Sequence, residues 1–286
     1  GALQGLKMAC GENPKRVYGE RNQAPSTRMG NVAGYRQAFA DATDYQHQWQ
    51  KYEAEVATYD KKKAKDRDPA EQPVPPKRDL RLETLVAAMR GQVQVQVHCY
   101  RADEMAVMLD LAQEFHFKIA AFHHGVEAYK IADRLAQEGV CGALWADWWG
   151  FKLEAYDGIW ENLAYVDAPK DGCAIVHSDS DEGIQRLNQE AAKAMSRGQR
   201  AGLDIPPERA IRWITSNAAK ALGIADRVGT LEPGKMADVV VWNRDPFSVY
   251  ALPDLVYIDG ALAFDRNHPP ATPRSDFLLG QPGVAR

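Results

Sequence analysis

The chain has 286 residues, 45% of them hydrophobic and 26% charged, so it can build a sizeable core and disorder is not its expected general state. The formal net charge of −4 argues against a nucleic-acid-binding protein, which would carry a basic footprint. No apolar run approaches the roughly 20 residues that a membrane-spanning helix needs.

The first third of the chain predicts one short strand and one long charged segment. LKMAC, residues 6–10, is a short apolar run typical of a strand. The segment from about 44 to 80 is polar and charge-laced, with aromatic residues at helical intervals and a proline-rich end. We expect an extended surface helix there, followed by a semi-rigid linker, inserted into the main fold.

From Gly91 onward, β-rich runs alternate with stretches of helical periodicity. Strands are predicted at QVQVQVHCY (92–100), FKIAAFHHG (117–125), VCGALWAD (140–147) and GCAIVHSD (172–179). Each is followed by helical sequence, and Gly139 is placed to end one of these helices. Such alternation predicts an α/β fold with parallel strands and helical crossovers. No glycine-rich nucleotide loop is present, which favours part of a (β/α)8 barrel over an open nucleotide-binding sheet.

The tail differs from the rest of the chain. Residues 226–286 contain short alternating strands and two turn pairs, Pro233-Gly234 and Asp259-Gly260, without helical periodicity. We therefore expect a small β module here. The four cysteines are scattered singly and form no CxxC pair, so we expect them to be free thiols in the core.

Four polar side chains lie at or just past the predicted strand ends: Lys7, His98, His124 and Asp179. In an α/β barrel these positions converge on the active site. Neutral imidazoles with an anionic oxygen ligand suit zinc or another divalent transition metal. Taken singly, each has a plain alternative: the histidines as hydrogen-bonded structural residues, Asp179 as a helix cap and Lys7 as a surface lysine.

Several longer motifs carry a resemblance. They are HCYRADE (98–104), FHHGVEAYKIAD (122–133), DWWGFKLEAYDGIWEN (147–162), VHSDSDE (176–182) and TSNAAKALGI followed by VGTLEPGKMADVVVWNRDP. In this order and over essentially the whole chain, they resemble the imidazolonepropionase-related branch of the amidohydrolase superfamily. The resemblance implies strands 4 to 8 of a TIM barrel over residues 1–225, and the C-terminal segment of a composite β-sandwich over residues 226–286.

The resemblance also implies a reaction and the residues that perform it. A metal-dependent hydrolase of this kind cleaves amide or cyclic amide C–N bonds with metal-activated water, using one or two divalent ions, most simply zinc. His98 and His124 would bind metal, and Asp179 would bind metal and transfer protons. Lys7 would be carboxylated and bridge two ions, with Glu12 as the alternative for this role.

Substrate-facing residues are expected next to these positions. Tyr100 and Arg101 follow His98 and could hold a substrate carboxylate, while Trp148 and Lys152 could line the pocket. The plain alternatives are that the tryptophan packs and that Arg101 pairs with a helix carboxylate.

The family's first strand carries an HxH pair, which none of the seven histidines forms here. We expect that pair, with strands 1 to 3, on a missing N-terminal segment of the same protein. This segment would act as the partner of the chain, and the chain alone would be inactive. Its substrate would be a small-molecule amide, and self-association is a further expectation. The functional alternatives are a non-catalytic metal-binding barrel, and a deaminase or phosphoester hydrolase on the same scaffold.

Overall fold

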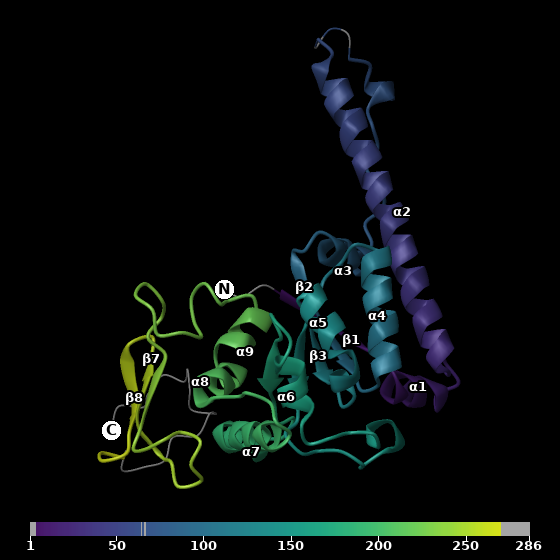
Figure 1. Ribbon diagram of the computed structural model, residues 1–286. Helices are drawn as coiled ribbons and strands as arrows, with labels where there is room; N and C mark the ends of the chain where they lie inside the picture. The colour runs from purple at the N-terminus through teal and green to yellow at the C-terminus, as the bar shows by residue number, and fades with distance from the viewer. Residues whose placement is uncertain (1–3, 64, 66, 270–286) are drawn as a thin grey trace, which may run out of the picture.

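The structure is a computed structural model that describes residues 4–63, 65 and 67–269. Its strands form a five-stranded parallel sheet and a three-stranded antiparallel sheet (Figure 1). The parallel strands are β1 (Gln4–Ala9), β2 (Val93–Cys99), β3 (Ile119–His124), β4 (Cys141–Leu144) and β5 (Ala174–Val176). The α-helices are α1 (Glu12–Gly19), α2 (Arg28–Lys61), α3 (Leu80–Met89), α4 (Ala102–Glu114), α5 (Ala132–Glu138), α6 (Asn162–Asp167), α7 (Leu187–Arg200), α8 (Pro207–Ala210) and α9 (Ser216–Ala221).

The parallel sheet follows the chain from one edge to the other, in the order β1-β2-β3-β4-β5. Helices lie between successive strands, so the predicted α/β alternation is confirmed. A doubly wound sheet reverses its strand order at a switch point. The described strands show no such reversal, and each crossover moves one position in the same direction. This order is also that of the wall of a (β/α)8 barrel.

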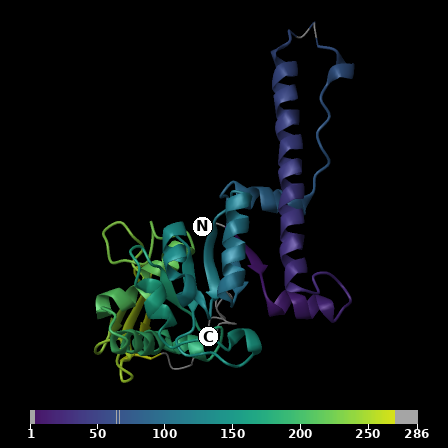
Figure 2. The ribbon, with the colours of Figure 1, turned by 45° about the vertical axis from the view of Figure 1, so that its right-hand side comes forward.

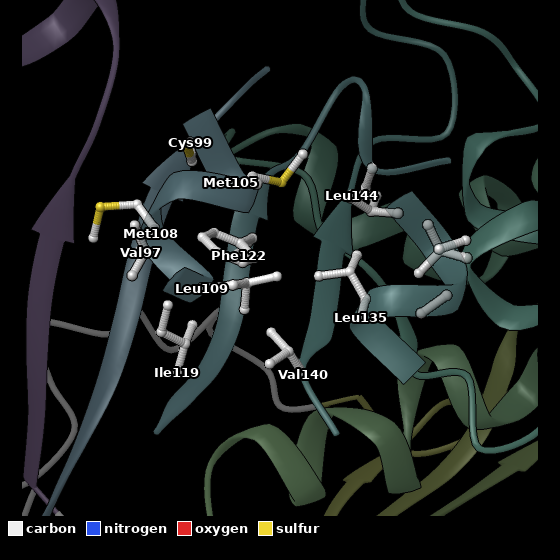
Figure 3. Close-up of a cluster of buried hydrophobic side chains, with 14 of the residues drawn as sticks. Val97, Cys99, Met105, Met108, Leu109, Ile119, Phe122, Leu135, Val140 and Leu144 are labelled. Carbon is white, nitrogen blue, oxygen red and sulfur yellow. The ribbon is translucent and has the colours of Figure 1, made fainter. Parts of the chain in front are cut away.

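The helix-facing side of the sheet holds the main hydrophobic core. Alternate residues of β2, including Val95 and Val97, are fully buried there, together with Phe122 of β3. Figure 3 shows Val97 and Phe122 on the side of the sheet where helix side chains such as Leu109 of α4 and Leu135 of α5 also lie. The period of two in the strands and of 3.6 in the helices brings the two apolar surfaces together.

The opposite side of the sheet is more polar. Gln94, Gln96 and His98 alternate with the buried valines of β2 and therefore share this face. Near the start of the strands it is closed by a small apolar cluster, to which α9 contributes Ala221. Gln96 donates from Nε2 to the carbonyl oxygen of Ala221 at 2.9 Å.

The predicted surface helix is α2, whose 34 residues begin at Arg28, well before the expected start near residue 44. Thr27 caps it by accepting a hydrogen bond from the backbone N–H of Gly30 at 2.9 Å. The buried side chains of α2 lie between Asn31 and Tyr45, and Phe39 among them stacks on Phe117 with ring centroids 4.4 Å apart. Its second half extends away from the body as an arm, and the chain returns alongside it (Figures 1 and 2).

The expectation of four free thiols is wrong. Disulfides join Cys10 to Cys99 and Cys141 to Cys173, with Cα atoms 5.1 and 4.6 Å apart. All four residues are buried, as expected. The pairs form because the parallel register places residues distant in sequence side by side: Ala9 lies opposite His98, and Gly142 lies opposite Ala174. Spacing along the chain carries no information on this register.

The described part of the tail forms the antiparallel sheet of β6 (Val239–Trp242), β7 (Pro253–Ile258) and β8 (Ala261–Asp265). Asp259 and Gly260 connect β7 to β8 with positive φ angles of 50° and 79°, which confirms the predicted turn. The rest of the expected β module, residues 270–286, lies outside the described residues. Among the described helices, none combines the length and the apolar character required to cross a bilayer.

Candidate metal centre

Two of the predicted metal ligands, His98 and His124, meet at the ends of neighbouring strands. Their ring centroids are 4.4 Å apart, and both side chains are buried. Simple alternation would place His124 on the helix-facing side with its strand partner Cys99. His124 instead has a left-handed φ of 75°, which turns its ring toward His98. A non-glycine residue held in this region costs of order 1 kcal/mol or more, and such strain concentrates at functional sites.

A third histidine completes this cluster. His177, one residue past β5, has its ring centroid 5.0 Å from that of His124. His98 Nε2, His124 Nδ1 and His177 Nε2 are all buried and have no hydrogen-bond partner among the described residues. Orphaned buried ring nitrogens are costly in a folded protein, and metal coordination is one way to satisfy them.

The environment keeps these rings neutral. Burial lowers the pKa of His98 from 6.5 to about 4, and the nearby positive charges of Lys152 and Lys7 act in the same direction. Burial also lowers the pKa of His124 to about 2 and that of His177 to about 3. At neutral pH each ring therefore keeps a lone pair, which is the form that binds a metal ion.

Lys7 and Asp179 lie close enough for their charges to act on the histidines of this face: Lys7 lowers the pKa of His98, and Asp179 acts in the raising direction on the pKa of His123. Lys7 lies opposite Gln96 in the sheet, so it shares the face of His98, and its charge contributes to the lowered pKa of His124. Asp179, three residues past β5, is exposed and has a left-handed φ of 52°. The structure thus brings His98 and His124 together, whereas among the described residues Asp179 does not join them in a group of ligand atoms within 4.8 Å of one another. The roles of Lys7 and Asp179 as ligands stay predictions.

Glu12, the alternative to Lys7, lies elsewhere. It begins α1, and its carboxylate is 3.2 Å from Lys15 Nζ and 3.8 Å from Arg28 Nη2. Its backbone N–H donates to Glu154 Oε2 at 2.8 Å. Glu12 therefore belongs to a network of charged groups beside the histidine cluster.

Tyr100 and Lys152 form one wall of the cluster. The Tyr100 ring is buried and stacks on His124 with centroids 5.3 Å apart, while Lys152 Nζ lies 3.8 Å from the centre of the Tyr100 ring. Burial raises the pKa of Tyr100 above its ordinary value of 10, so its hydroxyl stays protonated at neutral pH. Lys152 Nζ also contacts Glu154 at 2.8 Å and Asn13 at 3.1 Å.

The other two substrate candidates differ. Arg101 donates two hydrogen bonds, of 2.9 and 3.1 Å, to the carboxylate of Asp103 in the first turn of α4. Trp148 is 49% exposed, and its ring stacks on Trp145 at 5.8 Å. Trp145 in turn lies 4.6 Å from His124, so Trp148 extends an aromatic surface outward from the cluster.

Three residues in or beside the histidine cluster, His177, Trp145 and Glu154, were not predicted from the sequence. Trp145 and His177 lie near the C-terminal ends of the predicted strands 140–147 and 172–179, so the strand-end rule that selected His98 could have found them. Glu154 is almost fully buried and contacts Arg28 Nη2 at 3.3 Å. Those two residues are 126 positions apart, and a local sequence pattern cannot predict a contact over that separation.

The sequence of the chain is similar to those of several known proteins. A model of the amidohydrolase family matches residues 170–265. Amidohydrolase tasK of Hapsidospora irregularis is 35% identical over 268 residues, which cover 91% of this chain and 26% of that protein. The imidazolonepropionase of Shewanella oneidensis is 56% identical over 39 residues, or 14% of this chain and 10% of the relative.

A solved structure extends the likeness to the fold. The amidohydrolase from Thermotoga maritima MSB8 matches with a TM-score of 0.74 and 35% sequence identity, over 92% of this chain and 63% of that one. The chain therefore spans about a quarter of the length of amidohydrolase tasK and less than two thirds of the solved Thermotoga maritima chain.

Proposed function

Because this chain belongs to the amidohydrolase superfamily, we propose that it carries part of the metal centre of a hydrolase that cleaves amide or cyclic amide C–N bonds. The observation that carries the proposal is the contact between His98 and His124. Two buried, neutral imidazoles, each with an unpartnered ring nitrogen, converge at the ends of neighbouring parallel strands. These donors fit zinc or a similar divalent ion.

In this proposal His98 and His124 hold the metal, and His177 lies beside them as a further nitrogen donor. A divalent ion bound there would polarise the scissile carbonyl and lower the pKa of a bound water toward neutrality. Asp179 accepts the proton of the attacking water at its carboxylate and passes it to the leaving nitrogen. The neutral amine of Lys7 adds CO2 at Nζ and releases one proton, and the resulting carbamate would supply an anionic ligand that an unmodified ammonium cannot provide.

The walls of the site suggest its substrate class. Tyr100 keeps its proton, so its hydroxyl can donate a hydrogen bond to a substrate oxygen. Lys152 adds a positive charge above the same ring, and the exposed face of Trp148 adds an apolar surface. We propose a small amide that carries an apolar or aromatic group close to an anionic or carbonyl oxygen.

The proposal includes a partner that supplies the HxH pair. What supports it is the edge of the parallel sheet, since β1 pairs with β2 alone among the described strands. An unpaired strand edge is a template for another strand. In the barrel order, strand 3 of such a segment would lie beside β1, and strand 1 with its HxH pair would lie beside β5, which pairs with β4 alone among the described strands. A parallel strand there would bring the two histidines to the same end of the sheet as His98.

The first test is the metal content of purified chain, measured by elemental analysis after equilibration with zinc and removal of free ion. Binding should weaken by at least about tenfold in His98→Ala and His124→Ala, because each removes a ligand. His47→Ala is the matched control, since His47 is exposed on α2 and far from the cluster in sequence. Equal zinc affinity in all three variants and the parent would reject the histidine site.

The same assay separates the functional alternatives. An HxH-bearing segment added to the chain should raise zinc binding and produce amide hydrolysis. Two ions per chain, reduced to one by Lys7→Ala, would favour the carboxylated-lysine hydrolase. A single ion unaffected by Lys7→Ala would favour deaminase or imidazolonepropionase-like chemistry. Metal binding without turnover of any amide would favour the non-catalytic reading.

A further inference from the structure

A second group of metal-type side chains lies on the other side of the sheet. Cys10 follows β1, Cys99 ends β2 and Glu104 lies in the first turn of α4. Their potential ligand atoms all lie within 4.8 Å of one another, and this is the one such group found among the described residues. Cys99 alternates with His98 along β2, so this group faces the helices while His98 faces the histidine cluster.

The site is enclosed. Cys10 and Cys99 are 3% and 0% exposed, and the side chain of Glu104 is 13% exposed. Gly11 borders it with a left-handed φ of 80°, and a Cβ at that position would lie 3.1 Å from Glu104 Oε2 and 2.7 Å from Glu154 Oε2. A side chain at position 11 would therefore crowd both carboxylates.

In the structure the two sulfurs are joined in a disulfide, a form that offers no thiolate to a metal. Reduction would leave two thiols and one carboxylate at the same point. Two thiolates and an oxygen donor, with a water as fourth ligand, match the tetrahedral preference of zinc. Because a divalent ion with three anionic ligands has a net charge of −1, a neighbouring cation is needed. Arg28 provides it by donating from Nη1 to Glu104.

We propose that reduction of the Cys10–Cys99 disulfide creates a thiolate–carboxylate site for zinc or a similar divalent ion, with Glu104 as the third protein ligand. The site is separate from the histidine cluster and does not depend on the proposed hydrolase function. Metal occupancy there is controlled by the redox state of the cysteine pair.

The chemistry balances with a phosphine as reductant. The phosphine and one water convert the disulfide to two thiols, and the phosphine becomes its oxide. The phosphorus supplies the electron pair, and the water supplies the oxygen of the oxide and both thiol protons. When the ion binds, the two thiol protons pass to the buffer.

The second disulfide is a control within the same chain. Cys141 and Cys173 are equally buried, but they pack among Ala121, Ala143 and Ile175. Among the described residues, no carboxylate or histidine joins them in a group with ligand spacing. Reduction should therefore free two thiols at each pair, while a three-ligand site forms at the first pair alone.

The experiment uses cobalt(II) as the probe, since thiolate ligation gives it a charge-transfer absorption that nitrogen and oxygen ligands do not. The full chain is reduced with the phosphine, freed of it by anaerobic gel filtration and titrated with cobalt. We expect the thiolate band at one ion per chain in reduced protein and no band in oxidised protein. Cys141→Ser/Cys173→Ser should keep the band, and Cys10→Ser/Cys99→Ser should lose it. Glu104→Gln should weaken cobalt binding at this site by about tenfold or more.

Absence of the band in reduced, folded parent protein overturns the proposal, and so does its persistence in Cys10→Ser/Cys99→Ser. Loss of the band in Cys141→Ser/Cys173→Ser would place the site at the other pair. An unchanged cobalt affinity in Glu104→Gln would show that the carboxylate of Glu104 is not a ligand. Circular dichroism checks that each variant is folded, and the comparison of oxidised with reduced parent needs no variant. The result is independent of the proposed histidine site, because metal bound to histidines gives no thiolate band. If the histidine site binds no metal, the cobalt experiment still tests the cysteine site.

Discussion

The two faces of the parallel sheet come from the same strands and differ in chemistry. The helix-facing side is apolar around Val97 and Phe122, both fully buried. The opposite side holds Gln96, His98 and His123 and includes unpartnered ring nitrogens near the strand ends. One face therefore contributes stability through burial, while the other holds polar groups whose burial costs free energy. A polar group that is buried at such a cost in free energy is a candidate for a catalytic or binding role.

The largest expected effect is on the apolar face. Phe122→Ala should lower the free energy of unfolding by about 3–5 kcal/mol, because the change deletes a fully buried ring and leaves a cavity. Phe264→Ala is the control, since Phe264 of β8 is 39% exposed and should cost less than about 1.5 kcal/mol. Urea unfolding followed by circular dichroism measures both. Similar losses in the two variants would contradict the placement of Phe122 in the main hydrophobic core.

The next effect is a pH dependence that arises on the polar face. Because burial lowers the pKa of His177 to about 3, the folded chain holds fewer protons at this residue than the unfolded chain does below about pH 6.5. Stability should therefore be full above pH 6.5 and fall as the pH drops toward 4. One such histidine contributes a slope of about 1.4 kcal/mol per pH unit in this window.

The slope is measured by urea unfolding at several pH values between 7 and 4.5. His177→Gln should reduce it by about 1 kcal/mol per pH unit, whereas His47→Gln, at an exposed position of α2, should leave it unchanged. An unchanged slope in His177→Gln would mean that this ring is protonated in the folded state at mildly acidic pH.

The smallest effect concerns the link between the polar face and α9. Gln96 Oε1 lies 2.9 Å from His123 Nε2, and its Nε2 donates to Ala221. Since the amide oxygen can only accept, neutral His123 should carry its proton on Nε2. Gln96→Leu should cost about 1–2 kcal/mol, because it leaves two polar groups without partners.

Nitrogen chemical shifts of the imidazole report the tautomer of His123, and urea unfolding reports the stability. Gln92→Leu, at an exposed position before β2, should be close to neutral. A proton found on Nδ1 of His123 would contradict the assigned hydrogen bond.

The features that the sequence predicts are those that depend on local burial patterns. Alternation in 92–100 and the helical period after it identify β2 and α4, because local patterns record which side of each element is buried. The strand-end rule placed His98 and His124 near each other. The left-handed turn at His124, the pairing of Cys10 with Cys99 and the contact of Arg28 with Glu154 depend on register and long-range packing. Residue identity and local spacing do not encode these features. The early start of α2 is different, because Pro25 and the capping residue Thr27 mark it in the sequence, and a search for helix caps could have found it.

The arm formed by α2 has a hydrodynamic consequence. At about 1.5 Å per residue, its 34 residues extend about 51 Å. A compact domain of 286 residues has a radius of gyration of about 19 Å, and hence a diameter close to the length of this one helix. The molecule should thus tumble anisotropically, and its scattering profile should contain interatomic distances that a sphere of the same mass does not have.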